Sequence, residues 1–237
     1  LWIELDLNSG AEKYHRELDL QSGIAKIKYR ANGATITRET FMSAVDDVMA
    51  IRISADTTGT VSGRIRLDRE KDITVEPLGL DRLQLNGQIV DIPASEGGYD
   101  DNPGGSGPGG EHMRFGGRLL ARAKGGNVSA DKDGLVVQSA DELVLLFTAA
   151  TDFSLQKMDF DRSIDPGAVA NRVLDDAARK SWDKLLDDHI AEHRSYFDRV
   201  SIDLGTSAQD QLPTDVRMEE VKEGKEDPGL MALYFQF

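Results

Sequence analysis

Hydrophobic and polar residues alternate with a period of two through the first 155 or so positions of the chain. The segment "GTVSGRIRLDRE" places Val61, Ile65 and Leu67 on one face and Arg64 and Arg66 on the other. This alternation is typical of strands with one buried and one solvated face. Similar segments recur between Asn-Gly, Asp-Gly and Ser-Gly pairs, so the pattern predicts about ten or more strands.

One segment, "ELVLLFTAA", is apolar on both faces. Its continuous run from Leu143 to Phe147 is expected of a strand that is covered on both sides. The residues Val144, Phe147 and Thr148 favour a strand over a buried helical segment. Together with the alternating segments, this run predicts a mainly β fold, a large antiparallel β-sandwich that occupies residues 1–160.

The hydrophobic period changes to 3.6 after about residue 165, which indicates helices. Pro166 suits the first turn of one helix. Ser181 can cap a second helix, with Asp183 near the positive end of the helix dipole. A short strand is expected over residues 200–205, so we interpret residues 161–211 as a helical linker with a short strand.

The last segment, residues 212–237, is expected to be helical with an interruption near Gly224 and Pro228. Its apolar residues Leu230, Leu233, Tyr234 and Phe237 have helical spacing but no further sequence to cover them. The chain is therefore interpreted as a fragment. It also begins without an initiator Met or a signal peptide, so we expect any targeting segment to have been removed.

Composition limits the possible partners of the chain. The residues are 39% hydrophobic and 30% charged, and no run of about 18 apolar residues occurs, so no membrane span is expected. The net charge of −14 disfavours nucleic acid and anionic membranes as partners, since both require a basic surface. The absence of cysteine excludes disulfides, thiolate metal sites and cysteine nucleophiles, but it leaves the cellular location open.

Three short motifs match known sites. The first, "GSGPGG" from Gly105 to Gly110, matches the glycine pattern of dinucleotide-binding loops. That site requires the glycines to lie between a strand and a helix. Here a polar segment precedes the motif, Pro108 lies inside it, and an alternating strand follows, so a surface loop is the better interpretation.

The second motif, "HIAEH", places His189 and His193 four residues apart with Glu192 between them. On a helix both rings can reach one Zn²⁺, and the glutamate can activate a water molecule, as in inverted zinc peptidases. A third protein ligand from another helix is also needed, and the remaining 44 residues offer Glu219, Glu220, Glu223 and Glu226 without a matching helical scaffold. A helix that packs a histidine beside Leu185 and Leu186 is the better interpretation, and no metal is expected.

The third motif is the acidic set Asp159, Asp161 and Asp165, whose oxygens could bind Ca²⁺. The segment lacks the glycine at position 6 and the glutamate at position 12 of an EF-hand loop. A solvated loop therefore fits better. The four histidines also suggest no Ser-His-Asp arrangement, so the residues themselves identify no catalytic group, no substrate-binding group and no cofactor.

Five longer segments carry a family resemblance: "YHRELDL" (14–20), "TRETFMSAVDDVMAIRISA" (37–55), "FDRVSIDLG" (197–205), "LPTDVR" (212–217) and "DPGLMALYFQF" (227–237). They resemble the N-terminal part of glycoside hydrolase family 95, the α-L-fucosidases. The resemblance spans nearly the whole chain and is strongest at its C-terminal end. Val216 departs from it, because an acidic residue is expected there.

This resemblance implies a galactose-mutarotase-like supersandwich, a helical linker and, from residue 212, the first helix of a truncated (α/α)6 catalytic barrel. It also implies an inverting hydrolase that removes terminal α-1,2-linked L-fucose, or a related α-L-galactoside, from oligosaccharides. The catalytic carboxyl groups would lie in the barrel, so this chain alone is expected to be inactive. The implied location is periplasmic or secreted, and the sandwich would pack against the barrel.

Two other functions remain open. The sandwich could be a stand-alone carbohydrate-binding module, although only 6% of residues are aromatic and Trp2 and Trp182 are interpreted as packing residues. The zinc peptidase is a more distant alternative. Within the hydrolase interpretation, the Gly-rich and Asp-rich segment 95–111, or "HMRF" after it, is expected to reach the edge of the catalytic cleft.

Overall fold

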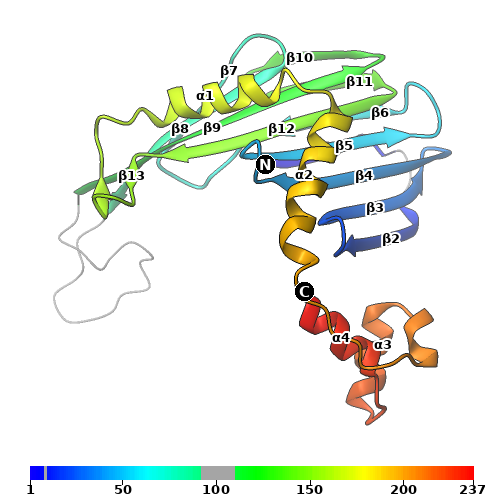
Figure 1. The fold of residues 1–237 in the computed structure, drawn as a ribbon. Helices are drawn as coiled ribbons and strands as arrows, with labels where there is room; N and C mark the ends of the chain where they lie inside the picture. Colours follow the sequence, from blue (N-terminus) through cyan, green and yellow to red (C-terminus); the bar gives the residue numbers. More distant parts are fainter. Residues whose placement is uncertain (8–9, 92–109) are drawn as a thin grey trace, which may run out of the picture.

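The computed structural model describes residues 1–7, 10–91 and 110–237, and these residues form three antiparallel sheets followed by helices (Figure 1). The largest sheet has the order β2-β3-β4-β5-β12-β9-β8-β7. Its strands are β2 (Glu12–Asp19), β3 (Ile24–Ala31), β4 (Ala34–Ser43), β5 (Val48–Ala55), β7 (Ile73–Pro77), β8 (Arg82–Asp91), β9 (Gly110–Lys124) and β12 (Glu142–Thr151).

The second sheet has four strands in the order β1-β6-β11-β10. They are β1 (Trp2–Leu5), β6 (Val61–Arg66), β10 (Asn127–Asp131) and β11 (Gly134–Ala140). Fully buried side chains from this sheet, such as Ile65 and Leu135, belong to one core together with Ile53 and Leu145 of the large sheet. The predicted β-sandwich is therefore confirmed.

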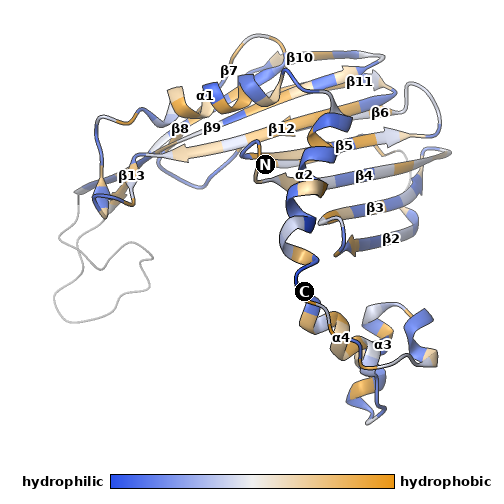
Figure 2. Ribbon diagram, in the orientation of Figure 1, coloured by the Kyte–Doolittle hydropathy of each residue, from blue (hydrophilic) through white to orange (hydrophobic). Residues whose placement is uncertain are grey.

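Both faces of strand β12 are covered, and this accounts for the continuous apolar run in its sequence. Leu143 and Leu145 are 0% exposed and lie in the core between the two sheets. Leu146 is also 0% exposed, but it belongs to a second core on the opposite face. Figure 2 shows hydrophobic residues recurring along β9 and β12, whereas the edge strand β2 is largely hydrophilic.

Two helices cover the second face of the large sheet (Figure 1). Helix α1 (Pro166–Ala177) contacts β9 and β12, and helix α2 (Trp182–Phe197) contacts β4. The Asp165 side chain accepts a hydrogen bond from the Ala168 backbone N–H, and the Ser181 hydroxyl accepts one from Lys184. Pro166 begins α1 and Asp183 lies in the first turn of α2, so the predicted helix starts are confirmed.

The C-terminal end contains a short 3-10 helix, η1 (Ala208–Gln211), and two helices, α3 (Thr214–Lys222) and α4 (Pro228–Gln236). The predicted interruption between the last two helices is confirmed. The strand predicted over 200–205 is wrong, because no strand in the described part of the chain pairs with this segment. Val200, Ile202 and Leu204 alternate correctly but are 40–58% exposed, and a strand without a partner gains no ladder hydrogen bonds.

Candidate functional sites

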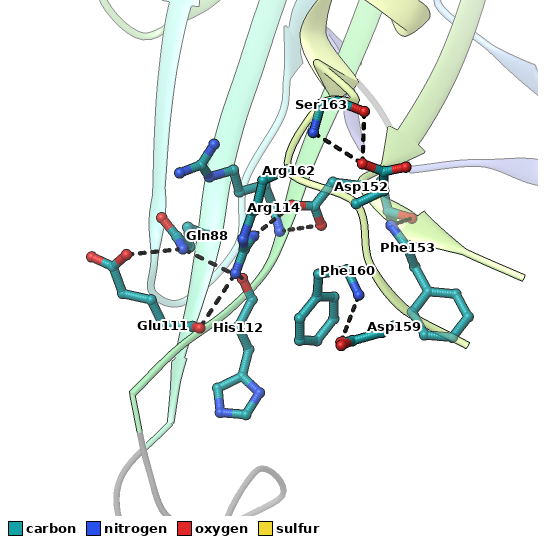
Figure 3. A network of polar contacts seen from close by, with 12 residues as sticks. Gln88, Glu111, His112, Arg114, Asp152, Phe153, Asp159, Phe160, Arg162 and Ser163 are labelled. Atoms are coloured by element: carbon teal, nitrogen blue, oxygen red, sulfur yellow. Dashed lines mark hydrogen bonds and ion pairs between the residues drawn. The ribbon is translucent and has the colours of Figure 1, made fainter. Parts of the chain in front are cut away.

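A polar network joins the end of β12 to the beginning of β9 (Figure 3). Asp152 follows β12 and is 0% exposed. One of its carboxylate oxygens accepts a hydrogen bond from the Arg114 backbone N–H at 2.9 Å, and the other pairs with the Arg162 guanidinium at 2.5 Å. A buried carboxylate requires such partners, so the pair fixes the segment after β12 to β9.

Arg162 also organises the aromatic residues of this network. Its second guanidinium nitrogen donates to the His112 carbonyl oxygen at 2.9 Å, and the guanidinium carbon lies 5.2 Å from the centre of the Phe160 ring. The Phe160 ring meets His112 and Phe153 edge to face, with centroid distances of 5.9 and 6.2 Å. Charge pairing and ring contacts therefore hold the same few residues in place.

The hairpin formed by β13 (Phe153–Ser154) and β14 (Asp159–Phe160) extends from this network. Leu155 is 79% exposed, Met158 is 75% exposed and Phe153 is 38% exposed. The hairpin thus combines a hydrogen-bonded polar base with a turn in which exposed Leu155 and Met158 flank the polar residues Gln156 and Lys157. The segment "DFSLQKMDF" has no pattern that distinguishes a surface hairpin from a buried one, so the sequence did not predict this feature.

A second feature is an apolar cavity of about 1230 Å³ between β2 and the C-terminal helices. Leu18 and Leu20 line it on the sheet side, and Met218, Leu230 and Met231 line it on the helical side. Tyr234 and Phe237 are 82% and 81% exposed. The helical spacing of Leu230, Leu233, Tyr234 and Phe237 was predicted, and of these Tyr234 and Phe237 are left largely uncovered.

A buried ion cluster holds the C-terminal helices together. The guanidinium of Arg217 in α3 pairs with both oxygens of Asp227 at 2.8 and 2.7 Å and with Asp210 of η1 at 2.9 Å. Asp227 also accepts a hydrogen bond from the Leu230 backbone N–H and so caps α4. These hydrogen bonds, above all the one from Arg217, lower the pKa of Asp227 to about 2, and the same pair raises the pKa of Arg217.

The motif residues His189 and His193 both lie on α2, as predicted, but they pack against other rings. His189 is 5% exposed and stacks on Phe41 with a centroid distance of 4.7 Å. His193 stacks on Phe197, and its Nε2 lies 2.7 Å from the Leu20 carbonyl oxygen. The structure describes no group of three metal ligands within 1–7, 10–91 and 110–237, and the packing interpretation of the histidine pair is the one that the contacts support.

The three acidic residues of "MDFDRSID" do not converge on one point. Asp159 accepts a hydrogen bond from the Phe160 backbone N–H, Asp161 pairs with Lys157 at 2.7 Å, and Asp165 caps α1. Lys157 and Ser163 lower the pKa of Asp161 to about 2. These carboxylates therefore stabilise local backbone, and the arrangement does not support the Ca²⁺ interpretation.

The glycine motif falls almost entirely outside the described residues. Only Gly110 is described, as the first residue of β9, and a strand follows it as predicted. The segment 95–111, which was expected to reach a catalytic cleft, is likewise described only at Gly110 and Glu111. Both expectations remain predictions.

The two tryptophans differ in exposure, although both were predicted to pack in the interior. Trp182 is 9% exposed and meets Phe41 edge to face at 5.1 Å, so that prediction is confirmed. Trp2 is 54% exposed, so that prediction is wrong. In β1 the alternate residues Ile3 and Leu5 pack toward the sandwich core, and Trp2 lies on the opposite face of an edge strand.

Comparison with known families agrees with this architecture. The protein-family model described as glycosyl hydrolase family 65, N-terminal domain, matches residues 1–156. The chain therefore belongs to this family, whose part of the chain forms the β-sandwich. The model described as glycosyl hydrolase family 95 catalytic domain matches residues 181–237. The resemblance to family 95 is thus confirmed, and the first 156 residues share their family with another group of glycosyl hydrolases.

Individual relatives agree with the family matches. Alpha-L-fucosidase 2 of Arabidopsis thaliana is 28% identical over 99% of this chain, and the chain spans about 30% of the length of that relative. A solved structure described as a candidate kojibiose phosphorylase from human microbiome matches with a TM-score of 0.54 at 14% identity. This match covers 84% of the chain and 25% of the solved structure, and it supports the fold alone. Among the described helices, none is long and apolar enough to cross a membrane.

Proposed function

We propose that this chain is the N-terminal, non-catalytic part of an inverting glycoside hydrolase that removes terminal α-1,2-linked L-fucose, or a related α-L-galactoside, from oligosaccharides. The observation that carries this proposal is the similarity to Alpha-L-fucosidase 2 over 99% of the chain. The order of the two family matches agrees with it, because a sandwich domain precedes the beginning of a family 95 catalytic domain. The domain boundaries near residues 160 and 211 are part of the proposal, and the family 95 match begins before the second of them, at residue 181.

The chemistry is assigned to the catalytic domain. An inverting glycosidase needs a carboxylic acid that protonates the leaving oxygen and a carboxylate that activates water on the opposite face of the sugar. These two groups stand roughly 6.5–9.5 Å apart in such enzymes. The proposal gives neither role to a residue of this chain, and it gives the sandwich the role of supporting the catalytic domain.

The C-terminal helices provide the connection to that domain. Arg217 and Asp227 fix the angle between α3 and α4, and the apolar residues of α4 then lie exposed on one segment. Removing apolar surface from water stabilises a packed structure by about 25 cal/mol per Å² of buried area, so covering these side chains would be favourable. We propose that these residues, Tyr234 and Phe237 among them, pack against further helices of an (α/α)6 barrel.

The test uses the complete reading-frame product, that is, the polypeptide encoded by the whole reading frame that contains this sequence. It measures the release of fucose from 2′-fucosyllactose by that protein. We expect release from this α-1,2 linkage, slower release from 3-fucosyllactose, and β-L-fucose as the first product by NMR, because the mechanism inverts the anomeric centre. An α-L-galactoside substrate tests the related specificity. A retained α anomer would contradict the mechanism, and absence of release from every fucoside and galactoside would contradict the substrate class.

A carbohydrate-binding function of the sandwich itself is a second candidate, and the exposure of Trp2 favours it. Exposed indole rings can stack on the apolar face of a sugar, and Trp2 lies beside Arg66 and Glu4, which form an ion pair at 2.6 Å. Titration of residues 1–237 with fucosylated sugars, followed by NMR, tests this function. Shifts that the Trp2→Ala variant abolishes would favour it, and unchanged spectra would remove it.

A further inference from the structure

A polar cavity of about 350 Å³ lies between the large sheet and the beginning of α1. Asn86 of β8 and Arg118 of β9 line it on the sheet side, and Asp165, Gly167 and Asn171 line it on the helix side. Ligand pockets usually have volumes of about 300–1,000 Å³, so this cavity has room for a ligand of about one ring. It shares no lining residue with the apolar cavity beside β2.

Two glycines explain why the cavity forms at this place. Asn86 pairs with Gly116 in the ladder between β8 and β9, and it lies with Arg118 on the sheet face that α1 covers. A β-carbon at Gly116 would lie 3.0 Å from the Gly167 backbone nitrogen, and one at Gly167 would lie 2.5 Å from Nη2 of Arg118. The absence of these β-carbons lets the beginning of α1 approach the sheet and leaves room beside the guanidinium.

Arg118 is buried without a direct ion-pair partner. It is 4% exposed, and its guanidinium forms no ion pair in the part of the chain that the structure describes. Its Nε donates to the Asn171 side-chain oxygen at 2.7 Å, and its Nη1 donates to the Asn86 side-chain oxygen at 3.1 Å and to two backbone carbonyl oxygens. Burial lowers the pKa of Arg118, and the charge of Asp165 acts in the opposite direction. A buried charge needs polar partners, so this guanidinium favours a ligand that supplies acceptor oxygens.

Several hydrogen-bonding groups of the cavity are left for a ligand. Nη2 of Arg118 has no hydrogen-bond partner among the described residues. Because the side-chain oxygens of Asn86 and Asn171 both accept from Arg118, the NH2 groups of these two amides remain as donors. Asp165 is exposed, and one of its oxygens accepts from the Ala168 backbone N–H, which leaves the other as an acceptor. The cavity therefore offers several donors and one carboxylate acceptor.

We propose that this cavity binds a saccharide: Arg118 and the two asparagine amides donate hydrogen bonds to neighbouring hydroxyl groups, and Asp165 accepts one from them. A hydroxyl group both donates and accepts, so it matches this mixed set. A simple anion would instead meet the charge of Asp165 and of a chain whose net charge is −14. Such binding goes beyond the proposed function, which gives the sandwich a supporting role, and Trp2 lies in the other sheet.

The first experiment uses the wild-type chain. Residues 1–237 are titrated separately with L-fucose, D-galactose and D-glucose up to about 50 mM, a range that covers millimolar dissociation constants. NMR follows the side-chain NH2 signals of Asn86 and Asn171 and the backbone amide of Ala168. We expect these signals to shift and saturate with at least one sugar. Absence of saturable shifts with all three sugars would overturn the proposal without requiring any variant to fold.

Two matched variants test how the sugar is held. Asp165→Asn keeps an oxygen that can cap α1 but removes the charged acceptor, so the dissociation constant should rise about fivefold or more. Asp176→Asn removes the same charge from an exposed position of the same helix, and it should leave the dissociation constant unchanged. Equal dissociation constants for Asp165→Asn and the wild-type chain would overturn the proposed binding mode.

Two further outcomes would assign the binding elsewhere. Shifts with acetate or inorganic phosphate but with no sugar, strengthened by Asp165→Asn, would identify an anion site and overturn the saccharide proposal. Loss of the sugar-induced shifts in Trp2→Ala would assign them to Trp2 and overturn it as well. Because binding is measured without hydrolysis, the cavity can bind a sugar even if the complete reading-frame product is not a fucosidase, and an active fucosidase can lack this binding.

Discussion

The sandwich and the C-terminal helices use apolar residues in opposite ways. In the sandwich, residues such as Ile53 and Leu145 are 0% exposed because the four-stranded sheet covers this face of the large sheet, and two helices cover the opposite face. At the C-terminal end, Tyr234 of α4 and Phe237, which follows α4, are more than 80% exposed. The helices are fixed to one another by an ion cluster around Arg217. The sandwich therefore buries its large apolar side chains within itself, whereas the helical end leaves several of its apolar side chains exposed.

The largest effect is expected from a cavity in the sandwich. Leu145→Ala should lower the free energy of unfolding by about 2–5 kcal/mol, because the site is fully buried and its surroundings relax only partly. Urea denaturation of residues 1–237 measures this change. Met42→Ala is the control, since Met42 is 65% exposed, and equal effects of both variants would contradict the comparison.

A smaller and local effect is expected from the ion cluster. Arg217→Met leaves the buried carboxylate of Asp227 without its cation, which should cost the helical end about 1–3 kcal/mol. Hydrogen exchange in α3 and α4 should become faster, while exchange in β12 stays unchanged. If β12 also loses protection, the two regions are not independent.

The same cluster predicts an acid transition. The pKa of Asp227 falls from its usual 3.8 to about 2 because of its pairing with Arg217. The stabilisation is therefore complete above about pH 4 and is lost as the pH falls toward 2. Far-ultraviolet circular dichroism between pH 5 and 2 should show loss of helix before loss of β structure. If the helical and β signals were lost at the same pH, the Arg217–Asp227 pair would not be the origin of the transition. An unchanged helical transition in the Arg217→Met variant would contradict this origin as well.

The smallest effect is expected at the exposed end of α4. Tyr234→Ser should change the unfolding free energy of residues 1–237 by less than about 0.5 kcal/mol, since its ring is 82% exposed. In the product of the complete reading frame, the same substitution should destabilise more strongly. Thermal unfolding of both proteins measures the difference, and equal small effects would exclude burial of this ring.

The sequence predicted those elements whose pattern reflects burial. The run from Leu143 to Phe147 identified a strand covered on both faces, and Pro166 and Ser181 located the helix starts. The strand expected over 200–205 failed because alternation does not reveal whether a partner strand is available. The prediction that Trp2 packs in the interior was wrong, because residue type does not show which face of an edge strand is covered.

The candidate sites were less predictable. Arg217 and Asp227 are ten residues apart in a charged segment, and their pairing appears only once two helices and a turn place them together. The pair of Asp152 and Arg162 depends on how the hairpin folds back onto β9. Such contacts join residues without a periodic pattern, so hydrophobic spacing could not reveal them.

The most direct test of the central claim is to measure fucose release from 2′-fucosyllactose at equal molar concentrations of residues 1–237 and of the complete reading-frame product. We expect release by the longer protein and none above background by residues 1–237, because the proposed function assigns the chemistry to the catalytic domain. Catalytic release by residues 1–237 alone would contradict the proposal that these residues support a catalytic domain without taking part in the chemistry.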